Sequence, residues 1–410
     1  MTPPTAKPPV LSLQYYSYPD ALGGAWKYTH AVNRRLAARG WPVHLITCKP
    51  RPDLPDEEVI DGVHFHRIAV TDAKRFDRLR RRIRQRIQML AEHQEFKRVH
   101  VHNPLTGYLA AGAPELKRAD FLVHVHSLWY DEERINVLGP EGRPVPGSLL
   151  WWRLQVIRFM ERRLFRRARS LLFLSQYMRG RFLETYRTKR ARLRVIPGGV
   201  DTEAFHPPTP QRPPEACRAA LGLPPEIPLL LTVRRLEPRM GLDRLIEALA
   251  AVAAEQPQTP FLLVIVGQGS LGPALREQVR QAGLQERVRF AGEVSPQALL
   301  DYYQAADGFV LPTAALEGFG LATVEALACG LPVLGTPVGG TVEILKPLDE
   351  RLLFDNASAE AMARKLSAFL RQPETFLALR KACREFALTR FGWDRVVDLI
   401  EEEFQLAGRS

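Results

Sequence analysis

Short apolar runs alternate with amphipathic helical patterns along the chain, and this alternation restricts the fold more than any other feature. Residues 10–16 form a first apolar run and residues 43–47 a second. Between them, apolar residues recur at helical spacing from Gly23–Gly24 to Arg39–Gly40. A strand, a glycine turn, a helix and a second strand open a parallel sheet. The sequence therefore predicts an α/β fold.

The alternation starts a second time after a proline-rich tract at residues 207–228, which we interpret as an interdomain connection with a short helix at 215–221. With 410 residues the chain is long enough for two domains. We expect one domain over residues 1–206 and another from residue 207 to 392. Strands are expected at residues 10–16, 43–47, 63–68, 99–104, 121–127, 170–175, 193–196, 228–233, 261–266, 288–291, 308–312 and 332–336. Residues 128–147 show no regular pattern, and we expect a long functional loop there.

A glycine-rich stretch with two glutamates eight residues apart follows the strand expected at 308–312. Gly318 and Gly320 let a ligand approach the backbone, and the amides near residues 321–323 lie at a predicted helix N-terminus, where anions bind. Glu317 lies before the turn and Glu325 one turn into the helix, so both carboxylates can face one crevice. Because carboxylates accept hydrogen bonds from vicinal hydroxyls, we predict a ligand with sugar hydroxyls at both ends and a diphosphate between them.

This stretch, with Pro312 before it and residues 326–333 after it, resembles the E-x7-E signature of the family 4 retaining glycosyltransferases. Residues 193–201 resemble the Pro-Gly-Gly-Val-Asp segment that closes the family's N-terminal domain. The resemblance covers about residues 10–405. It implies the GT-B fold, in which two Rossmann-like domains face a central cleft, and it implies that a C-terminal helix, residues 393–410, crosses back to the first domain.

The resemblance also implies a reaction and its partners. The enzyme would move a sugar from a nucleotide-diphosphate donor, a UDP-sugar or GDP-mannose, to an acceptor and keep the anomeric configuration. The acceptor stays open: a glycolipid or polysaccharide precursor, a small polar molecule or a protein. The irregular residues 128–147 would lie on the acceptor side. In the family, the first glutamate of the signature lies at the transferred sugar and the second holds the ribose, which gives these roles to Glu317 and Glu325.

Two arginines in a strand-to-helix turn match a second family pattern. That pattern is Gly-Arg-Leu followed by Lys-Gly, and its arginine and lysine grip the donor diphosphate. Arg235 matches the arginine, while the lysine position falls on Met240, next to Arg239. We expect Arg235 to stabilise the leaving diphosphate, with Arg239 as a second cation. The alternative, an exposed turn arginine, fits Arg234 and Arg239 better than Arg235.

The first half supplies weaker site signals. Gly23 and Gly24 resemble the family's N-terminal glycine loop, and residues 123–127, Val-His-Val-His-Ser, resemble the segment whose last histidine approaches the transferred sugar. His126 is thus the predicted sugar contact, and a histidine that hydrogen-bonds within its own domain is the alternative. Strand ends place Gly24, His102 and His126 on one rim. We expect His100 and His124 on the other side of their strands.

These arguments define the predicted site. The predicted catalytic residues are His126, Glu317 and Arg235. The predicted donor-binding residues are Gly23, Gly24, Arg235, Arg239, Gly267, Val294, Glu317, Phe319, Gly320, Leu321 and Glu325. We expect no cofactor and no metal, because no DxD-type carboxylate pair is present and arginines with helix ends can neutralise a diphosphate.

The net charge of +12 arises from 57 Lys and Arg against 45 Asp and Glu, with basic tracts at residues 74–86 and 153–194. Such tracts suit nucleic acid, an anionic membrane surface or a phosphorylated substrate, and a solvated arginine-rich surface is the plainer alternative. Trp151 and Trp152 begin an arginine-rich amphipathic helix, which favours peripheral contact with an anionic membrane. A helix packed on its own sheet is the alternative.

Other features exclude whole classes of protein. The four cysteines lack metal or CxxC spacing and predict free thiols. No apolar run reaches the ~20 residues of a membrane span, and the N-terminus lacks a signal-peptide core. We expect a cytoplasmic protein, at most peripheral at the inner membrane face. Two other functions stay open: a sugar-nucleotide epimerase or phosphorylase on the same fold, and a basic nucleic-acid-binding protein, which would leave the glutamate pair unexplained.

Overall fold

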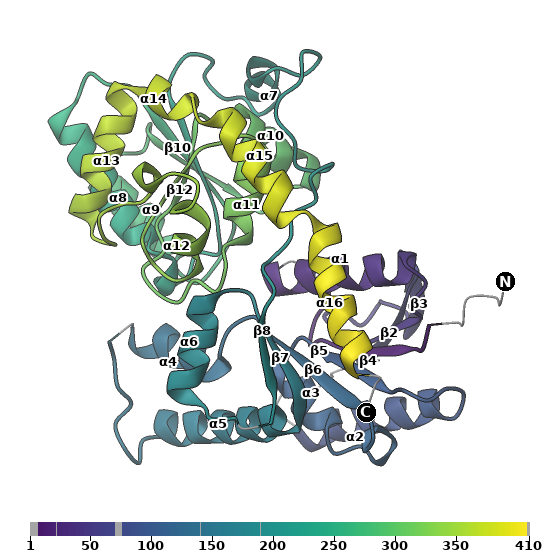
Figure 1. The fold of residues 1–410 in the computed structure, drawn as a ribbon. Coiled ribbons are helices and arrows are strands. Elements are labelled where there is room, and N and C mark those ends of the chain that lie inside the picture. The colour runs from purple at the N-terminus through teal and green to yellow at the C-terminus, as the bar shows by residue number, and fades with distance from the viewer. Residues whose placement is uncertain (1–6, 22, 70–75, 140, 189, 408–410) are drawn as a thin grey trace. The chain divides into compact units, whose positions relative to one another are not determined.

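The computed structural model describes residues 7–21, 23–69, 76–139, 141–188 and 190–407 (Figure 1). By its internal contacts the chain divides into two units, each built on one sheet. Unit 1 comprises Met1–Tyr130, Pro144–Pro197 and Trp393–Ser410, and unit 2 comprises Asp131–Arg143 and Gly198–Gly392. The predicted α/β class with two Rossmann-like sheets is confirmed, and the predicted domain limits stay a prediction.

The sheet of unit 1 has eight strands in the order β3-β4-β2-β1-β5-β6-β7-β8. Every neighbouring pair is parallel except β3 and β4, which are antiparallel. The strands are β1 Val10–Leu13, β2 Val43–Lys49, β3 Glu57–Ile60, β4 Val63–Ala69, β5 Arg98–Val101, β6 Asp120–Val125, β7 Ala168–Phe173 and β8 Arg192–Val195. The strand order reverses at β1, so the switch point, where ligands bind in such sheets, lies between β1 and β5.

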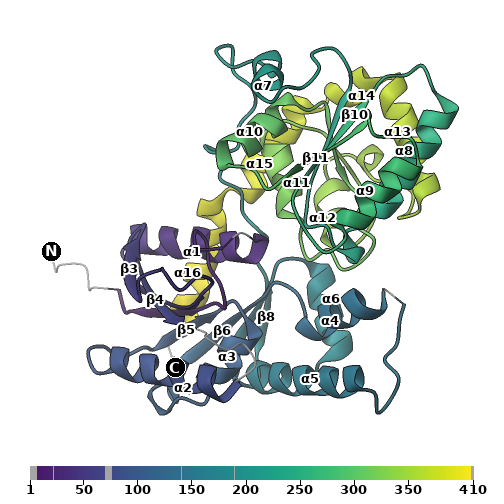
Figure 2. The ribbon, with the colours of Figure 1, turned by 180° about the vertical axis from the view of Figure 1, so that it is seen from behind.

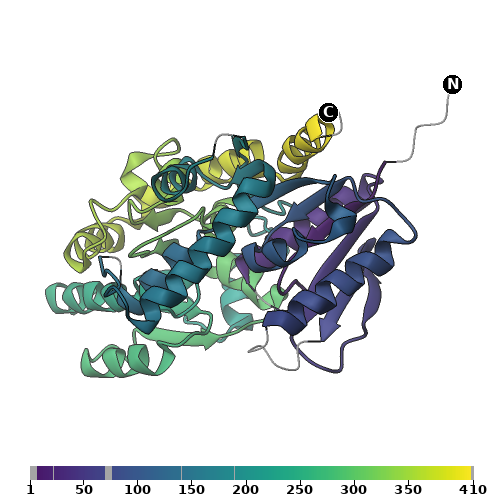
Figure 3. The same cartoon turned by 90° about the horizontal axis from the view of Figure 1, so that it is seen from below.

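Amphipathic helices cover this sheet. In α2, Leu79, Ile83 and Ile87 recur every four residues and are buried, while the arginines at 80, 81 and 82 are exposed. Figure 3 shows the row of α2, α3 and α5 that packs side by side. The helices of unit 1 are α1 Gly24–Ala38, α2 Phe76–Ala91, α3 Pro104–Ala110, η1 Pro114–Leu116, the start of α4 Trp129–Leu138, α5 Leu149–Arg167, α6 Gln176–Thr185 and α16 Trp393–Ala407.

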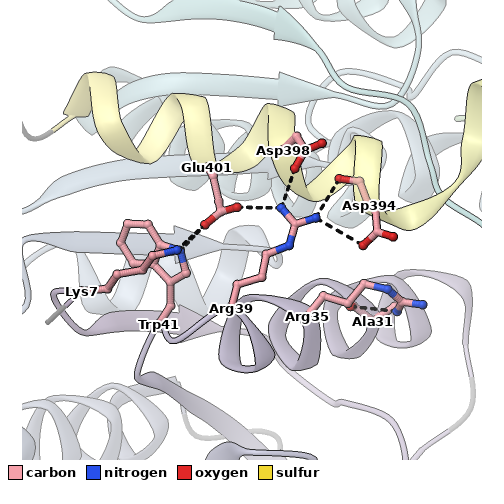
Figure 4. A network of polar contacts seen from close by, with 8 residues as sticks. All are labelled: Lys7, Ala31, Arg35, Arg39, Trp41, Asp394, Asp398 and Glu401. Carbon is pink, nitrogen blue, oxygen red and sulfur yellow. Dashed lines mark hydrogen bonds and ion pairs between the residues drawn. The ribbon is translucent and has the colours of Figure 1, made fainter. Parts of the chain in front are cut away.

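The C-terminal helix α16 packs on unit 1, as predicted. Its apolar face is fully buried, and its polar face meets α1 through the ion-pair network of Figure 4. Arg39, which follows the last residue of α1, donates to Asp398 at 2.6 Å and to Glu401 at 2.7 Å. Trp41 Nε1 donates to the same Glu401 at 2.6 Å. Burial and charge together attach this distant segment to the first sheet.

The sheet of unit 2 has five parallel strands in the order β11-β10-β9-β12-β13, with its switch point between β9 and β12. Figure 2 shows α8, α9 and α13 side by side against it. The strands are β9 Leu229–Val233, β10 Leu262–Val266, β11 Val288–Gly292, β12 Gly308–Leu311 and β13 Val333–Gly335. The helices are α7 Pro214–Ala220, η2 Pro238–Met240, α8 Leu242–Glu255, α9 Gly272–Gln281, α10 Pro296–Ala305, α11 Leu321–Ala328, α12 Gly340–Leu345, η3 Glu350–Leu352, α13 Ala359–Arg371, α14 Pro373–Leu377 and α15 Arg380–Phe391.

The prediction of an irregular segment over residues 128–147 was wrong, because it contains α4. The carboxylate of Glu161 on α5 accepts hydrogen bonds from the amides of Trp129 and Tyr130, at 2.8 and 3.3 Å. The start of this helix is thus capped by a side chain that is distant in the sequence. The residues next to the helix start therefore carry no capping signal from which the helix could be predicted. The edge strand β3 was also not predicted. All four cysteines are free, as expected, and no helix in the described residues is both long and apolar enough to cross a bilayer.

Candidate functional site

The loops after β9 and β12, the two strands at the switch point of unit 2, pack directly on each other. Gly241 has a φ of 72°, and a Cβ there would lie 1.9 Å from the carbonyl oxygen of Pro312, so only glycine fits. The amide of Ala314 donates to the Arg239 carbonyl at 3.0 Å. Backbone contact therefore brings the arginine turn, residues 234–241, against the loop that leads to Glu317.

The backbone of Glu317 is held from both sides. Leu316 has a φ of 57°, a strained conformation for a bulky residue, and Arg239 Nη1 donates to its carbonyl oxygen at 3.1 Å. From the other side, the amide of Gly340 donates to the Glu317 carbonyl at 2.9 Å. A Cβ on Gly339 would lie 2.1 Å from that carbonyl oxygen. Strain of this kind concentrates at functional sites, and here it directs the Glu317 side chain.

The Glu317 carboxylate accepts two hydrogen bonds on one oxygen. Arg234 Nη2 and Thr313 Oγ1 both lie 3.0 Å from Oε2, which leaves Oε1 to accept from a ligand. The Arg234 side chain is only 5% exposed. Its Nε and Nη1 are buried and have no hydrogen-bond partner among the described residues. Burial lowers the pKa of Arg234, against the opposing attraction of Glu317.

The alternative of exposed turn arginines, given as a better fit for Arg234 and Arg239 than for Arg235, was wrong. Arg234 and Arg239 are buried, whereas the Arg235 side chain is 57% exposed. The reason is that Arg234 continues strand pairing past β9, with its amide donating to the Val266 carbonyl at 2.9 Å. Glu132 Oε1 lies 3.2 Å from Arg235 Nη2 and 2.8 Å from Arg239 Nη2. One carboxylate therefore pairs with both arginines that were expected to hold the diphosphate and balances only one of their two charges.

The predicted residues Gly267 and Val294 follow β10 and β11 at the same edge of the sheet. Gly267 has a φ of 131°, and a Cβ there would lie 1.9 Å from the Arg234 carbonyl oxygen. This glycine lets the loop after β10 pack on the arginine turn. Val294 is half-buried in the loop after β11. Their contact with a donor remains a prediction.

Helix α11 carries the rest of the predicted donor set. Gly320 caps the helix with a φ of 95°, and the half-buried Leu321 is its first residue. The amide of Thr323, which we expected to be available to an anion, already donates to the Gly320 carbonyl at 3.0 Å. Phe319 is buried. Tyr303 donates to Glu325 Oε2 at 2.9 Å, which fixes the orientation of that carboxylate.

In unit 1, four histidines lie at the carboxyl ends of β5 and β6. His100 and His124 belong to these strands, and His102 and His126 come just after them. His102 Nδ1 and His126 Nε2 lie 3.4 Å apart, so these two residues meet as predicted. The expectation that His100 and His124 face the other side was wrong. The rings of His100 and His102 are 4.0 Å apart, and those of His124 and His126 are 5.2 Å apart. Residues two apart in a strand share a face, so all four rings belong to one layer.

Burial keeps these imidazoles neutral. It lowers the pKa of His126 to about 4 and that of His100 to about 3, and the pKa values of His102 and His124 lie well below the usual range for the same reason. In the described residues, nitrogens of His100, His102 and His124 lie within 4.8 Å of one another and could hold a metal ion. Tetrahedral zinc would need its ligand atoms about 3.3 Å apart.

The predicted glycine turn of unit 1 precedes α1, which begins at Gly24. Gly23 has an extended backbone, and a Cβ there would lie 2.8 Å from the Trp26 ring. The preceding loop is anchored by Asp20, which accepts from Arg67 at 2.6 and 3.0 Å. The role of Gly23 and Gly24 at a phosphate remains a prediction.

Sequence reasoning missed three side chains that shape this site. Arg234 and Thr313 each follow the end of a switch-point strand, and that position was a usable signal. Glu132 carries no such signal, because it lies in the helix that the sequence did not predict.

Comparisons with known proteins agree with this architecture. A family model described as "Glycosyltransferase Family 4" matches residues 22–204, and one described as "Glycosyl transferases group 1" matches residues 215–388. A D-inositol 3-phosphate glycosyltransferase of Jonesia denitrificans is 28% identical over 386 residues, which cover 91% of this chain and 88% of the relative. A GDP-mannose-dependent alpha-(1-6)-phosphatidylinositol monomannoside mannosyltransferase of Mycobacterium tuberculosis is 31% identical over 250 residues, 60% of this chain and 63% of the relative.

Solved structures match nearly the whole chain. A sucrose-phosphate synthase from Thermosynechococcus elongatus has a TM-score of 0.82 and 25% identity, with 98% of this chain and all of that chain covered. Anabaena HepE in complex with UDP-glucose has a TM-score of 0.76 and 18% identity, with 97% of this chain and 99% of that chain covered.

Proposed function

Because the chain belongs to the group 1 glycosyltransferases of family 4, which transfer sugars from nucleotide sugars, we propose that unit 2 binds its donor at the carboxyl ends of β9 and β12. Family membership sets aside the epimerase, phosphorylase and nucleic-acid-binding alternatives. The observation that carries the proposal is the directed Glu317 carboxylate beside buried arginine donors at the switch point. An ionised acceptor for sugar hydroxyls and N–H donors for phosphate are the two groups that a nucleotide-diphosphate sugar requires.

Each predicted residue then has a physical task. Arg235, Arg239 and the amides at the start of α11 would hold the diphosphate and stabilise the charge that develops as the nucleotide leaves. Glu317 would bind hydroxyls of the transferred sugar through Oε1, and Glu325 would bind the ribose. His126 would contact the sugar as a neutral hydrogen-bonding group. The anomeric configuration would be kept, as in the family, and no metal is needed in this scheme.

A thermal-shift screen over UDP, GDP and ADP and their sugars tests the donor class. A ligand that binds only the folded state, and is present at 100 times its Kd, stabilises the folded protein by about 2.7 kcal/mol. One nucleotide series should therefore raise the melting temperature. A UDP-sugar or GDP-mannose is the expected donor. One relative is named for GDP-mannose and one structural neighbour holds UDP-glucose. No shift with any of these ligands would contradict the proposal.

We further propose that helix α5 docks on an anionic membrane that carries the acceptor. One face of α5, with Leu154, Ile157 and Leu164, is buried, and the helix packs on α3 and β7. The other face exposes an apolar stripe at positions three, four and three apart: Leu149, Trp152, Val156 and Phe159, which are 91, 58, 56 and 55% exposed. Exposed arginines flank the stripe at 153, 162, 163 and 166. Apolar side chains between cations match an anionic bilayer surface.

Co-sedimentation with vesicles tests this docking surface. Wild-type protein should bind vesicles rich in phosphatidylglycerol more strongly than vesicles of phosphatidylcholine, and added salt should weaken that binding. Trp152→Gln combined with Phe159→Gln should abolish most of it. The control is Leu388→Gln, which replaces an exposed apolar side chain of unit 2 and should bind the vesicles as wild type does. Equal binding of wild type and the double variant would exclude α5 as the docking surface.

A further inference from the structure

We propose that Arg234 is a donor-diphosphate cation of this enzyme and that it also positions Glu317. The inference rests on the proposed function and adds a residue that the family pattern leaves as glycine. Arg234 is nearly fully buried, and its Nη2 donates to Glu317. The remaining donors, Nε and Nη1, have no partner in the described part of the chain. A buried guanidinium with unused N–H groups is destabilising unless water or a ligand supplies the acceptors, and a charged ligand gives the stronger hydrogen bonds.

The charges around the turn single out Arg234 among its three arginines. Arg235 and Arg239 share the carboxylate of Glu132. Among the described residues, the carboxylate that pairs with Arg234 is that of Glu317, which also accepts from Thr313. Three cations face two carboxylates, so the described site has an excess positive charge before any ligand arrives. A diphosphate supplies the missing negative charge and several acceptor oxygens.

Met240 gives a second, independent reason. Its sulfur lies 3.0 Å from Arg234 Nη2, so the guanidinium occupies the space beside residue 240. The family resemblance places a lysine at this position. A buried lysine there would repel Arg234 at close range in a low-dielectric surrounding, whereas methionine adds no charge and adapts to the guanidinium. The family pattern has a glycine and a lysine at these two positions, whereas this chain has Arg234 and Met240. The number of positive charges at this place is therefore the same, but the charge is carried by residue 234 instead of residue 240.

A charge-exchange experiment tests the inference by calorimetric titration with the nucleoside diphosphate that wild type binds. Arg234→Gln should weaken binding at least tenfold, and Arg234→Lys, which keeps the charge, should stay within about threefold of wild type. The exchange variant, Arg234→Gly with Met240→Lys, should recover at least half of the lost affinity on a logarithmic scale. Arg244→Gln, an arginine on α8 that donates to the Ala357 carbonyl, is the control and should bind as wild type does.

The positioning role has its own readout. Because Arg234→Gln removes the hydrogen bond that orients Glu317, this variant should also have a lower kcat. Arg234→Lys should keep most of the wild-type kcat. Equal affinity and kcat in wild type and Arg234→Gln would overturn the inference and leave the proposed function intact. An exchange variant no better than Arg234→Gln would overturn it as well. If wild type bound no nucleoside diphosphate, the proposed function would fail first and the inference with it. Circular dichroism of each variant confirms folding, and Arg234→Lys decides the question if Arg234→Gln does not fold.

Discussion

The carboxylate of Glu132 lies 2.8 Å from Nη2 of Arg239 and 3.2 Å from Nη2 of Arg235, where a donor phosphate is expected to bind. An internal carboxylate therefore competes with the ligand for the same cations. Replacement by a neutral amide removes that competition, so Glu132→Gln should tighten nucleoside diphosphate binding about three- to tenfold. Calorimetric titration measures the change. Glu141→Gln, an exposed acid in the same segment, is the control, and an unchanged or weaker affinity in Glu132→Gln would contradict the competition.

The second prediction concerns Gly198, which packs against the loop before α11. A Cβ on Gly198 would lie 2.5 Å from the ring of Phe319, closer than any real contact. Gly198→Ala should therefore lower the free energy of unfolding by about 1–3 kcal/mol and weaken nucleotide binding through the displaced loop. Calorimetric melting measures the first effect. Gly272→Ala, whose Cβ would meet only ordinary contacts at 3.7 Å, should change neither property. Equal melting of Gly198→Ala and wild type would refute the prediction.

The third prediction concerns pH and the histidine layer. The folded-state pKa values of His100 and His126 are about 3 and about 4, below the unfolded value near 6.5. Between these limits the unfolded chain binds more protons than the folded chain, so stability is complete above pH 6.5 and falls as the pH drops toward 4. Each such histidine contributes about 1.4 kcal/mol per pH unit.

Tryptophan fluorescence reports the unfolding of unit 1, because all six tryptophans belong to that unit. Urea unfolding followed by fluorescence should give a lower free energy at pH 5.5 than at pH 7. His100→Leu should reduce this difference in free energy by about the contribution of one histidine. Replacing the exposed His93 with Gln should leave the difference unchanged. A pH-independent free energy would show that the four rings do not remain neutral in the folded state.

Regular, locally encoded elements were predictable from the sequence. The helix predicted over 242–255 has those limits in α8, because its apolar periodicity is strong and it starts after a glycine. The Glu317–Glu325 stretch was found because glycines, carboxylates and a helix start are consecutive in the chain. This stretch follows β12, one of the two strands at the switch point of unit 2.

Features that depend on distant contacts were not predictable in the same way. Helix α4 relies on Glu161 for its cap, and Glu132 on that helix was therefore missed. The burial of Arg234 depends on strand pairing with β10 and on Glu317, both remote in sequence. The misplaced His100 and His124 are a different case, because the two-residue period of a strand already put them beside His102 and His126.

We propose that the two glutamates bind opposite ends of one donor molecule, Glu325 the ribose and Glu317 the transferred sugar. Calorimetric titration of Glu325→Gln and Glu317→Gln, each with the nucleoside diphosphate and with its sugar derivative, tests it most directly. Glu325→Gln should weaken the binding of both ligands at least tenfold. Glu317→Gln should weaken the sugar derivative alone and lower turnover about 10- to 100-fold, the loss of one charged hydrogen bond. An unchanged affinity of Glu325→Gln for the nucleoside diphosphate would contradict the account.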